Sequence, residues 1–332
     1  MALIERRAEG LYCPRGDFYI DPWRPVARAV LTHAHADHAR AGSAQYFAAQ
    51  DGAAIFAHRL GADALIEPLA YAQTRRFNDV RVSLHPAGHI LGSAQVRVEA
   101  DGEVWVVTGD YKRDPDPTCA PFELVPCDTL ITEATFALPV YRWQPASLVA
   151  REVLAWWDDC VKQKIPAILF CYALGKAQRL LAELALLCDR PVQVHGALLE
   201  LTAIYRRAGV PMLETVAVAD SARERDFAGE LILAPPSAAS GPWMRRFRHA
   251  STGFASGWMQ VRGNRRRRGY DRGFVLSDHA DWPALVATAR ECGAQRVLAT
   301  HGDVDSYVRF LCEAGIDAAE LATEFGGETG AH

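Results

Sequence analysis

The chain has 332 residues, half of them hydrophobic, and a formal net charge of −4 at pH 7. This length allows one large domain or two ordinary ones, and no apolar run is long enough to span a membrane. Residues 1–10 carry charges and lack an apolar core segment, so we expect no signal peptide, no membrane partner and a cytoplasmic location. The eight cysteines form no CxxC pair, which favours reduced thiols over a disulfide framework.

Short strands separated by Gly, Pro and Asp dominate the sequence up to residue 135. Alternating apolar residues or a bias toward β-branched side chains predict strands over 18–20, 29–31, 80–84, 94–98, 104–108 and 129–132. Few helices are expected in this part. One is predicted to start at Asp37, and another to cover about 56–66.

From about residue 146 helices and strands alternate along the chain. Apolar residues at helical spacing cover 146–164, and a buried strand follows at 167–171. The same alternation predicts helices over 175–187 and 197–208 and strands over 191–194 and 231–235. This βαβ rhythm indicates a second unit with a parallel sheet.

Residues 240–274 are expected to be rich in loops, and they are strongly basic and aromatic. After them the chain is predicted to return to the first domain. The elements of that return are a strand over 273–277, a helix over 282–292, a strand over 296–300 and a helix over 304–314.

Three histidines and one aspartate lie close together in the segment HAHADH, which covers residues 33–38. Neutral imidazoles and carboxylates are the ligands that Zn²⁺-like ions take in proteins. His33 and His35 are two positions apart, so both side chains can point to one side of an extended segment. A turn then carries Asp37 and His38 toward a second ion. The segment therefore predicts two neighbouring metal ions.

Three more candidate ligands follow predicted strands. His89 lies in a glycine-flanked turn after the strand at 80–84, Asp110 follows the strand at 104–108, and His301 ends the strand at 296–300. Each of them alone would more often be an ordinary turn or hydrogen-bonded residue. Their occurrence together with the first cluster favours the role of ligand.

The segments HAHADH, GHILGSA (88–94) and TGD (108–110), with the late histidine, resemble the metallo-β-lactamase superfamily. The resemblance implies an α/β fold, a four-layer αββα sandwich with two divalent metal ions at one edge. It implies that His33, His35 and His89 hold one ion, that Asp37, His38 and His301 hold the other, and that Asp110 bridges them. It also implies that Asp21 orients a ligand. Zn²⁺ is the favoured ion, with Mn²⁺ or Fe²⁺ as alternatives.

A further group of residues resembles motifs A, B and C of the β-CASP nucleases, a group that includes Artemis-type DNA nucleases and the endonuclease of messenger-RNA 3′-end formation. These residues are Glu133, His279 and His301. The resemblance implies a metallo-β-lactamase domain over 1–140 and 270–332, and an inserted α/β β-CASP cap domain over 141–269.

Catalytic roles follow from the same resemblance and from the chemistry of phosphodiester cleavage. We expect His279 to protonate the leaving oxygen as a general acid, with Glu133 holding its other ring nitrogen. Asp37 and Asp110 are expected to act as catalytic residues through the metal ions. The alternative for His279 is a capping histidine before the helix at 282–292.

Several residues are candidates for binding the phosphates of a substrate. Lys176 follows Gly175 at the start of a helix, where backbone N–H groups and a lysine favour a phosphate. Ser93 lies in the turn after His89. The basic segment contributes Arg265, Arg266, Arg267 and Arg268. The alternatives are a plain βα turn for Lys176 and a solvated loop for the arginines.

The longer segments resemble the family of bacterial ligase-associated DNA damage response exonucleases. They are residues 10–14, 20–25, 88–94, 111–112, 116–122 and 172–178. This resemblance implies a two-metal DNA exonuclease in DNA repair, acting on single-stranded DNA or accessible ends, beside a DNA ligase and a helicase. A β-CASP ribonuclease is the main alternative, because His301 permits it. A small-molecule metallo-hydrolase and an inactive nucleic-acid-binding subunit fit less well, since the cap segment is present and every ligand position is filled.

Overall fold

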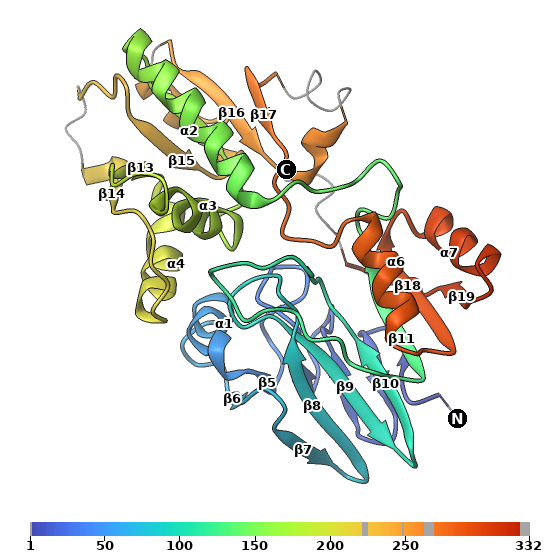
Figure 1. The fold of residues 1–332 in the computed structure, drawn as a ribbon. Coiled ribbons are helices and arrows are strands. Elements are labelled where there is room, and N and C mark those ends of the chain that lie inside the picture. Colours follow the sequence, from blue (N-terminus) through green and yellow to red (C-terminus); the bar gives the residue numbers. More distant parts are fainter. Residues whose placement is uncertain (1, 221–224, 248, 262–268, 326–332) are drawn as a thin grey trace. The chain divides into compact units, whose positions relative to one another are not determined.

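The computed structural model describes residues 2–220, 225–247, 249–261 and 269–325 (Figure 1). The chain forms two compact units. Among the described residues, one takes those up to Tyr141 and those from His279 to Phe325, and the other takes Arg142–Asp278. In this described part of the chain, no helix combines the length and the apolar character needed to cross a membrane.

The first sheet of the first unit follows the order of the chain. Its strands are β1 (Glu5–Arg6), β2 (Leu11–Cys13), β3 (Phe18–Ile20), β4 (Arg28–Val30), β5 (Gln45–Ala49) and β6 (Ile66–Leu69). The pairs from β1 to β3 are antiparallel, and those from β3 to β6 are parallel. The short η1 (Gln50–Gly52) leads into α1 (Ala53–Leu60), which packs on β5 and β6.

The second sheet of this unit has the order β19-β18-β11-β10-β9-β8-β7. The strands are β7 (Thr74–Phe77), β8 (Val80–Pro86), β9 (Ala94–Ala100), β10 (Glu103–Val107), β11 (Thr129–Ala134), β18 (Arg296–Gly302) and β19 (Asp317–Glu320). The helices α6 (Trp282–Glu291) and α7 (Val304–Glu313) belong to the same unit. β10, β11, β18 and β19 are parallel, whereas the pairs from β7 to β10 are antiparallel.

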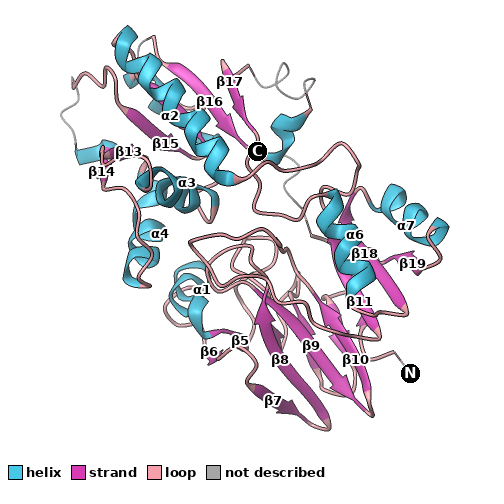
Figure 2. Ribbon diagram, in the orientation of Figure 1, coloured by secondary structure: helices cyan, strands magenta, loops and turns pink. Residues whose placement is uncertain are grey.

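Alternation along the strands sets the layers of the first unit, as expected for a pleated sheet. In β10, Trp105 and Val107 lie in the core shared with the first sheet. Val106 lies instead in the core shared with α6 and α7. The unit is therefore an αββα sandwich with α1 on one outer side and α6 and α7 on the other, as predicted (Figure 2).

The second unit has a sheet of parallel strands in the order β14-β13-β15-β12-β16-β17. The strands are β12 (Ala167–Phe170), β13 (Val192–Val194), β14 (Thr215–Ala217), β15 (Leu231–Ala234), β16 (Ser251–Ala255) and β17 (Arg272–Phe274). The helices α2 (Ala146–Gln163), α3 (Lys176–Ala185) and α4 (Gly196–Arg207) share one apolar core with Leu169. Ile168 and Phe170 face a second core with the short η3 (Pro236–Ala238), η4 (Pro242–Arg246) and η5 (Gly257–Gln260); η2 (Val218–Asp220) follows β14.

Three expectations from the sequence are wrong in detail. No helix starts at Asp37: the amides of His38 and Ala39 both donate to the carbonyl of His35, which closes a turn that does not continue. The segment 240–274 contains β16, which pairs with β12 inside the sheet. β17 pairs with β16, so residues 270–278 belong to the second unit and not to the first domain.

The strand directions explain where polar residues gather in the first unit. Because β10, β11 and β18 are parallel, their carboxyl ends lie at one edge of the sheet. β8 runs in the same direction as β10, since both are antiparallel to β9, so the turn after β8 reaches the same edge. Loops at the carboxyl edge of such strands are the usual place for a site in α/β proteins.

Candidate metal centre

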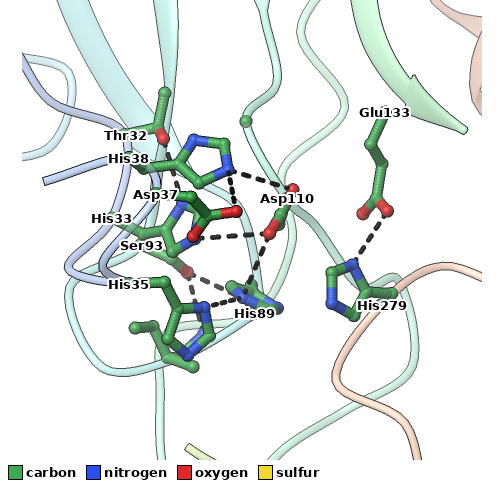
Figure 3. A network of polar contacts seen from close by, with 12 residues as sticks. Thr32, His33, His35, Asp37, His38, His89, Ser93, Asp110, Glu133 and His279 are labelled. Carbon is green, nitrogen blue, oxygen red and sulfur yellow. Dashed lines mark hydrogen bonds and ion pairs between the residues drawn. The ribbon is translucent and has the colours of Figure 1, made fainter. Parts of the chain in front are cut away.

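The carboxylate of Asp110 lies at the centre of the polar edge, 4% exposed, just after β10. Its Oδ2 atom is 3.3 Å from His33 Nε2 and 3.8 Å from His89 Nε2. Its Oδ1 atom is 3.2 Å from His301 Nε2 and 3.7 Å from His38 Nε2. One carboxylate oxygen therefore faces each of the two predicted ligand sets, as a bridging ligand would (Figure 3).

The first ligand set comes together around Asp110 Oδ2. His35 Nδ1 lies 3.1 Å from His89 Nε2, and the ring of His33 lies within 4.9 Å of both. One ligand atom from each of these histidines and one from Asp110 all lie within 4.8 Å of one another. The turn of residues 33–35 and the turn after β8 thus face each other, as Figure 3 shows.

The second ligand set lies around Asp110 Oδ1. His38, Asp110 and His301 each offer an atom within 4.8 Å of the others. Asp37 Oδ2 lies 3.8 Å from His38 Nε2, and the Asp37 side chain is 26% exposed. The structure therefore brings six of the seven candidate ligands together in two groups that share Asp110, and Asp37 lies beside His38 of the second group.

Asp21 holds one histidine of each set. Its carboxylate accepts a hydrogen bond from His38 Nδ1 over 2.8 Å and one from the Thr32 amide over 2.7 Å. It also accepts a bond from the Thr32 hydroxyl, whose oxygen lies 3.0 Å from His33 Nδ1. Because the hydroxyl donates to Asp21, its oxygen accepts from His33 Nδ1–H. With Nδ1 of both rings engaged in this way, Nε2 is the atom that each histidine would offer to a metal ion, once His38 has lost its second proton.

Gly109 allows the end of β10 to approach the Thr32 loop. Its backbone has a positive φ of +56°, and a Cβ atom there would lie 2.5 Å from Thr32 Oγ1. A side chain at this position would therefore separate Asp110 from the loop that carries the histidines.

Buried polar atoms in the centre lack ordinary partners. The Nε2 atoms of His33 and His38 are buried and make no hydrogen bond of proper geometry with any residue that the structure describes. A buried polar atom left in this state is costly unless something else binds it. Nitrogen and carboxylate donors around such atoms fit divalent cations of the zinc type.

Charges in the centre also favour a cation. Burial and the neighbouring His38 lower the pKa of His33 well below its usual range. Burial disfavours a charge on His38, but Asp110 and Asp21 outweigh it and raise the pKa of His38 to about 9. Burial likewise opposes ionisation of Asp110, yet His38 and His279 hold its pKa well below the usual value. Without metal, a proton on His38 therefore balances the carboxylate.

A histidine and a glutamate form a buried pair beside Asp110. His279 Nδ1 lies 2.8 Å from Glu133 Oε2, although the two residues are 146 positions apart in the sequence. The other oxygen of Glu133 accepts the amide of Tyr111 over 2.8 Å. Atoms of Asp110, Glu133 and His279 lie within 4.8 Å of one another. Glu133 thus fixes the orientation of His279 at the edge of the metal centre (Figure 3).

The chain is similar in sequence to several known proteins. No family model matches the chain. The chain is 31% identical to a probable DNA ligase of Opitutus terrae over 94% of its own length and 30% of that protein. It is 28% identical to an RNase J-like protein of Methanocaldococcus jannaschii over 42% of its length and 35% of the relative. It is 29% identical to endoribonuclease ysh1 of Aspergillus fumigatus over 55% of its length and 22% of the relative.

A solved structure of a protein of unknown function from Enterococcus faecalis has a TM-score of 0.60, with 11% identity, over 90% of this chain and 80% of that one. This likeness shows the fold alone. In sequence and in fold the chain is similar to the β-CASP nuclease group of the metallo-β-lactamase superfamily. It spans only between 22% and 35% of the length of the three curated relatives named above.

Two of the predicted phosphate-binding residues, Ser93 and Lys176, have other partners in the structure. The buried hydroxyl of Ser93 accepts the amides of His89 and Ile90 over 3.0 and 3.2 Å, which holds the His89 turn. Lys176 is buried, and its Nζ atom lies 3.6 Å from Asp278 Oδ2. Phosphate binding by Ser93 and Lys176 stays a prediction. Arg265, Arg266, Arg267 and Arg268 lie outside the described residues.

Two residues of the centre were missed by the sequence analysis. The hydroxyl of Thr32 bridges the carboxylate of Asp21 and Nδ1 of His33. Phe325 stacks on His38, with 4.4 Å between the ring centroids. Thr32 directly precedes the histidine motif, so its position was a usable signal. Phe325 lies near the other end of the chain, and no local pattern connects it with a metal centre.

Replacing Asp21 by Asn tests how the histidines of this centre are held. The amide cannot accept hydrogen bonds from His38 and Thr32 with both oxygens, so the imidazoles lose their fixed orientation. We expect metal affinity to fall by about tenfold or more, as for other partners of metal-bound histidines. Equilibrium dialysis with Zn²⁺ measures it. Asp17→Asn is the control, because Asp17 is exposed and pairs with Arg28. Equal affinity in the Asp21 and Asp17 variants would contradict this role.

Proposed function

We propose that the protein is a two-metal DNA exonuclease that hydrolyses phosphodiester bonds at DNA ends. The observation that carries the proposal is Asp110, which turns one oxygen to each ligand set and lies beside the Glu133–His279 pair. Two divalent cations, Zn²⁺ by preference or Mn²⁺, would lower the pKa of water and neutralise phosphate charge there. Their ligands would be His33, His35, His89, Asp37, His38 and His301, with Asp110 shared.

His279 supplies the proton that the leaving group needs. When a phosphodiester is hydrolysed, a water oxygen bonds to phosphorus and the bond to the leaving oxygen breaks, which releases a poor alkoxide leaving group. His279 Nε2 holds a proton and passes it to that oxygen. Glu133 accepts the Nδ1–H of the same ring, so the ring presents Nε2 to the centre. Hydrolysis of an acyl bond in a small molecule does not require such a pair.

The likeness to a probable DNA ligase supports DNA as the substrate. Nearly the whole chain, 94%, matches a region that makes up only 30% of that protein. A region of this kind within a protein named as a ligase fits a nuclease that prepares DNA ends for sealing. We therefore propose a role in DNA repair in the cytoplasm, beside a ligase and a helicase.

A ribonuclease is the second candidate function. The RNase J-like protein and endoribonuclease ysh1 both match parts of the chain. His301 occupies the last ligand position in this structure, and the presence of a histidine there fits RNA cleavage as well as DNA cleavage.

Replacing His279 by Ala tests the acid role. The metal ligands stay in place, so metal content should be unchanged, while cleavage should slow by about 100-fold or more because the leaving oxygen lacks a proton donor. His85→Ala is a matched control, since His85 Nδ1 also pairs with a glutamate, Glu123, over 2.9 Å. Single-turnover cleavage rates and metal analysis measure the two effects. Wild-type turnover in the His279 variant would refute the role.

Labelled DNA and RNA oligonucleotides of one sequence decide between the two candidate functions. Metal-free protein resupplied with Zn²⁺ or Mn²⁺ should shorten the DNA progressively from an end and leave the RNA largely intact. Exhaustive EDTA treatment should abolish the activity, because the nucleophile depends on the cations. Faster cleavage of RNA would favour the ribonuclease, and activity that survives EDTA would contradict the metal assignment.

A further inference from the structure

The last described residues, 321–325, form a segment that we call the tail. The amide of Leu321 donates to a carbonyl of β18 over 2.8 Å, which extends the edge pairing of the second sheet. Arg40 then donates to the carbonyl of Glu324 over 3.3 Å, and Arg24 lies 3.5 Å from its carboxylate. In the sequence, Arg24 and Arg40 lie on either side of β4 and the HAHADH loop that follows it. The tail therefore connects the second sheet with the loop that carries HAHADH.

The tail places an aromatic ring on two metal-ligand candidates. Phe325 is stacked on His38, with 4.4 Å between ring centroids and 14° between planes. It meets His301 almost at a right angle, with 5.7 Å between centroids. The ring of Trp23 also packs nearly at a right angle to Phe325, with 5.7 Å between the ring centroids. His38 comes from the first sheet's loop and His301 from β18, so one ring holds both halves of the second ligand set.

We propose that Phe325 is a positioning residue that keeps the second metal ion bound. An imidazole turns readily about its χ2 angle, and a stacked ring removes that freedom before the ion arrives. Ring stacking also contributes more than the buried area alone. The half-buried ring lines the same small cavity as Asp21, His38 and His301, and it covers them from one side.

The first metal ion is held differently, so the two ions should respond differently to a change of Phe325. His33, His35 and His89 contact one another's rings, and Thr32 and Ser93 hold His33 and the His89 turn. The ring contacts of Phe325 are with Trp23, His38 and His301 instead.

Zinc content against chelator concentration tests the proposal. The full chain is loaded with Zn²⁺ and dialysed against a graded series of EDTA, and zinc per chain is measured by atomic emission. In Phe325→Ala, one ion should leave at an EDTA concentration about tenfold lower than in the wild type, while the other should leave as before. Phe325→Tyr keeps the ring and should behave like the wild type. Glu320→Ala is the control, because Glu320 is an exposed residue just before the tail.

Two results would overturn the proposal: both ions retained as in the wild type, or both lost in parallel. Phe325→Leu keeps an apolar side chain without the ring plane, and its circular dichroism is compared with that of the alanine variant, so that unfolding does not hide the outcome. The proposal rests on the two-metal function. A wild-type chain that takes up fewer than two ions would contradict that function itself, which is a different result from a Phe325 variant that keeps both.

Discussion

The interaction on which the centre depends is that of one buried carboxylate with histidines from both sheets. Asp110 would be costly to bury alone, because a charge in the protein interior needs a partner of opposite sign. His33 and His89 face one of its oxygens, and His38 and His301 face the other. Without metal, a proton on His38 supplies the balancing charge. Cation binding displaces such protons, so the same geometry that stabilises the empty centre also prepares it for two ions.

The residues of this centre come from both sides of the inserted unit in the sequence. HAHADH and Glu133 come before the second unit in the sequence, whereas His279 and His301 come after it. The Glu133–His279 pair and the second ligand set thus form only when the chain returns to the first unit. Parallel pairing of β11 with β18 brings the two parts together, because both strands end at the edge where Asp110 lies. The inserted unit has its own parallel sheet and its own apolar cores, so the insertion leaves the αββα layers intact.

Much of this arrangement could be predicted from local patterns. The candidate ligands could be proposed because imidazoles and carboxylates at strand ends have few other reasons to gather, and α2 could be predicted from its apolar spacing. β16 was missed because Gly253 and the flanking polar residues hide its pairing with β12. The helix expected at Asp37 does not form, since the amides of His38 and Ala39 close a single turn on the carbonyl of His35 and the turn does not continue. The stacking of Phe325 on His38 is a purely tertiary contact, and no local sequence pattern predicts it.

Anomalous diffraction from crystals of the zinc-loaded protein would examine this centre without reference to any substrate. Two zinc peaks are expected beside Asp110, one among His33, His35 and His89 and the other among Asp37, His38 and His301. The carboxylate of Asp110 should contact both peaks. A single peak, or zinc bound away from Asp110, would show that the shared carboxylate is not the basis of the site.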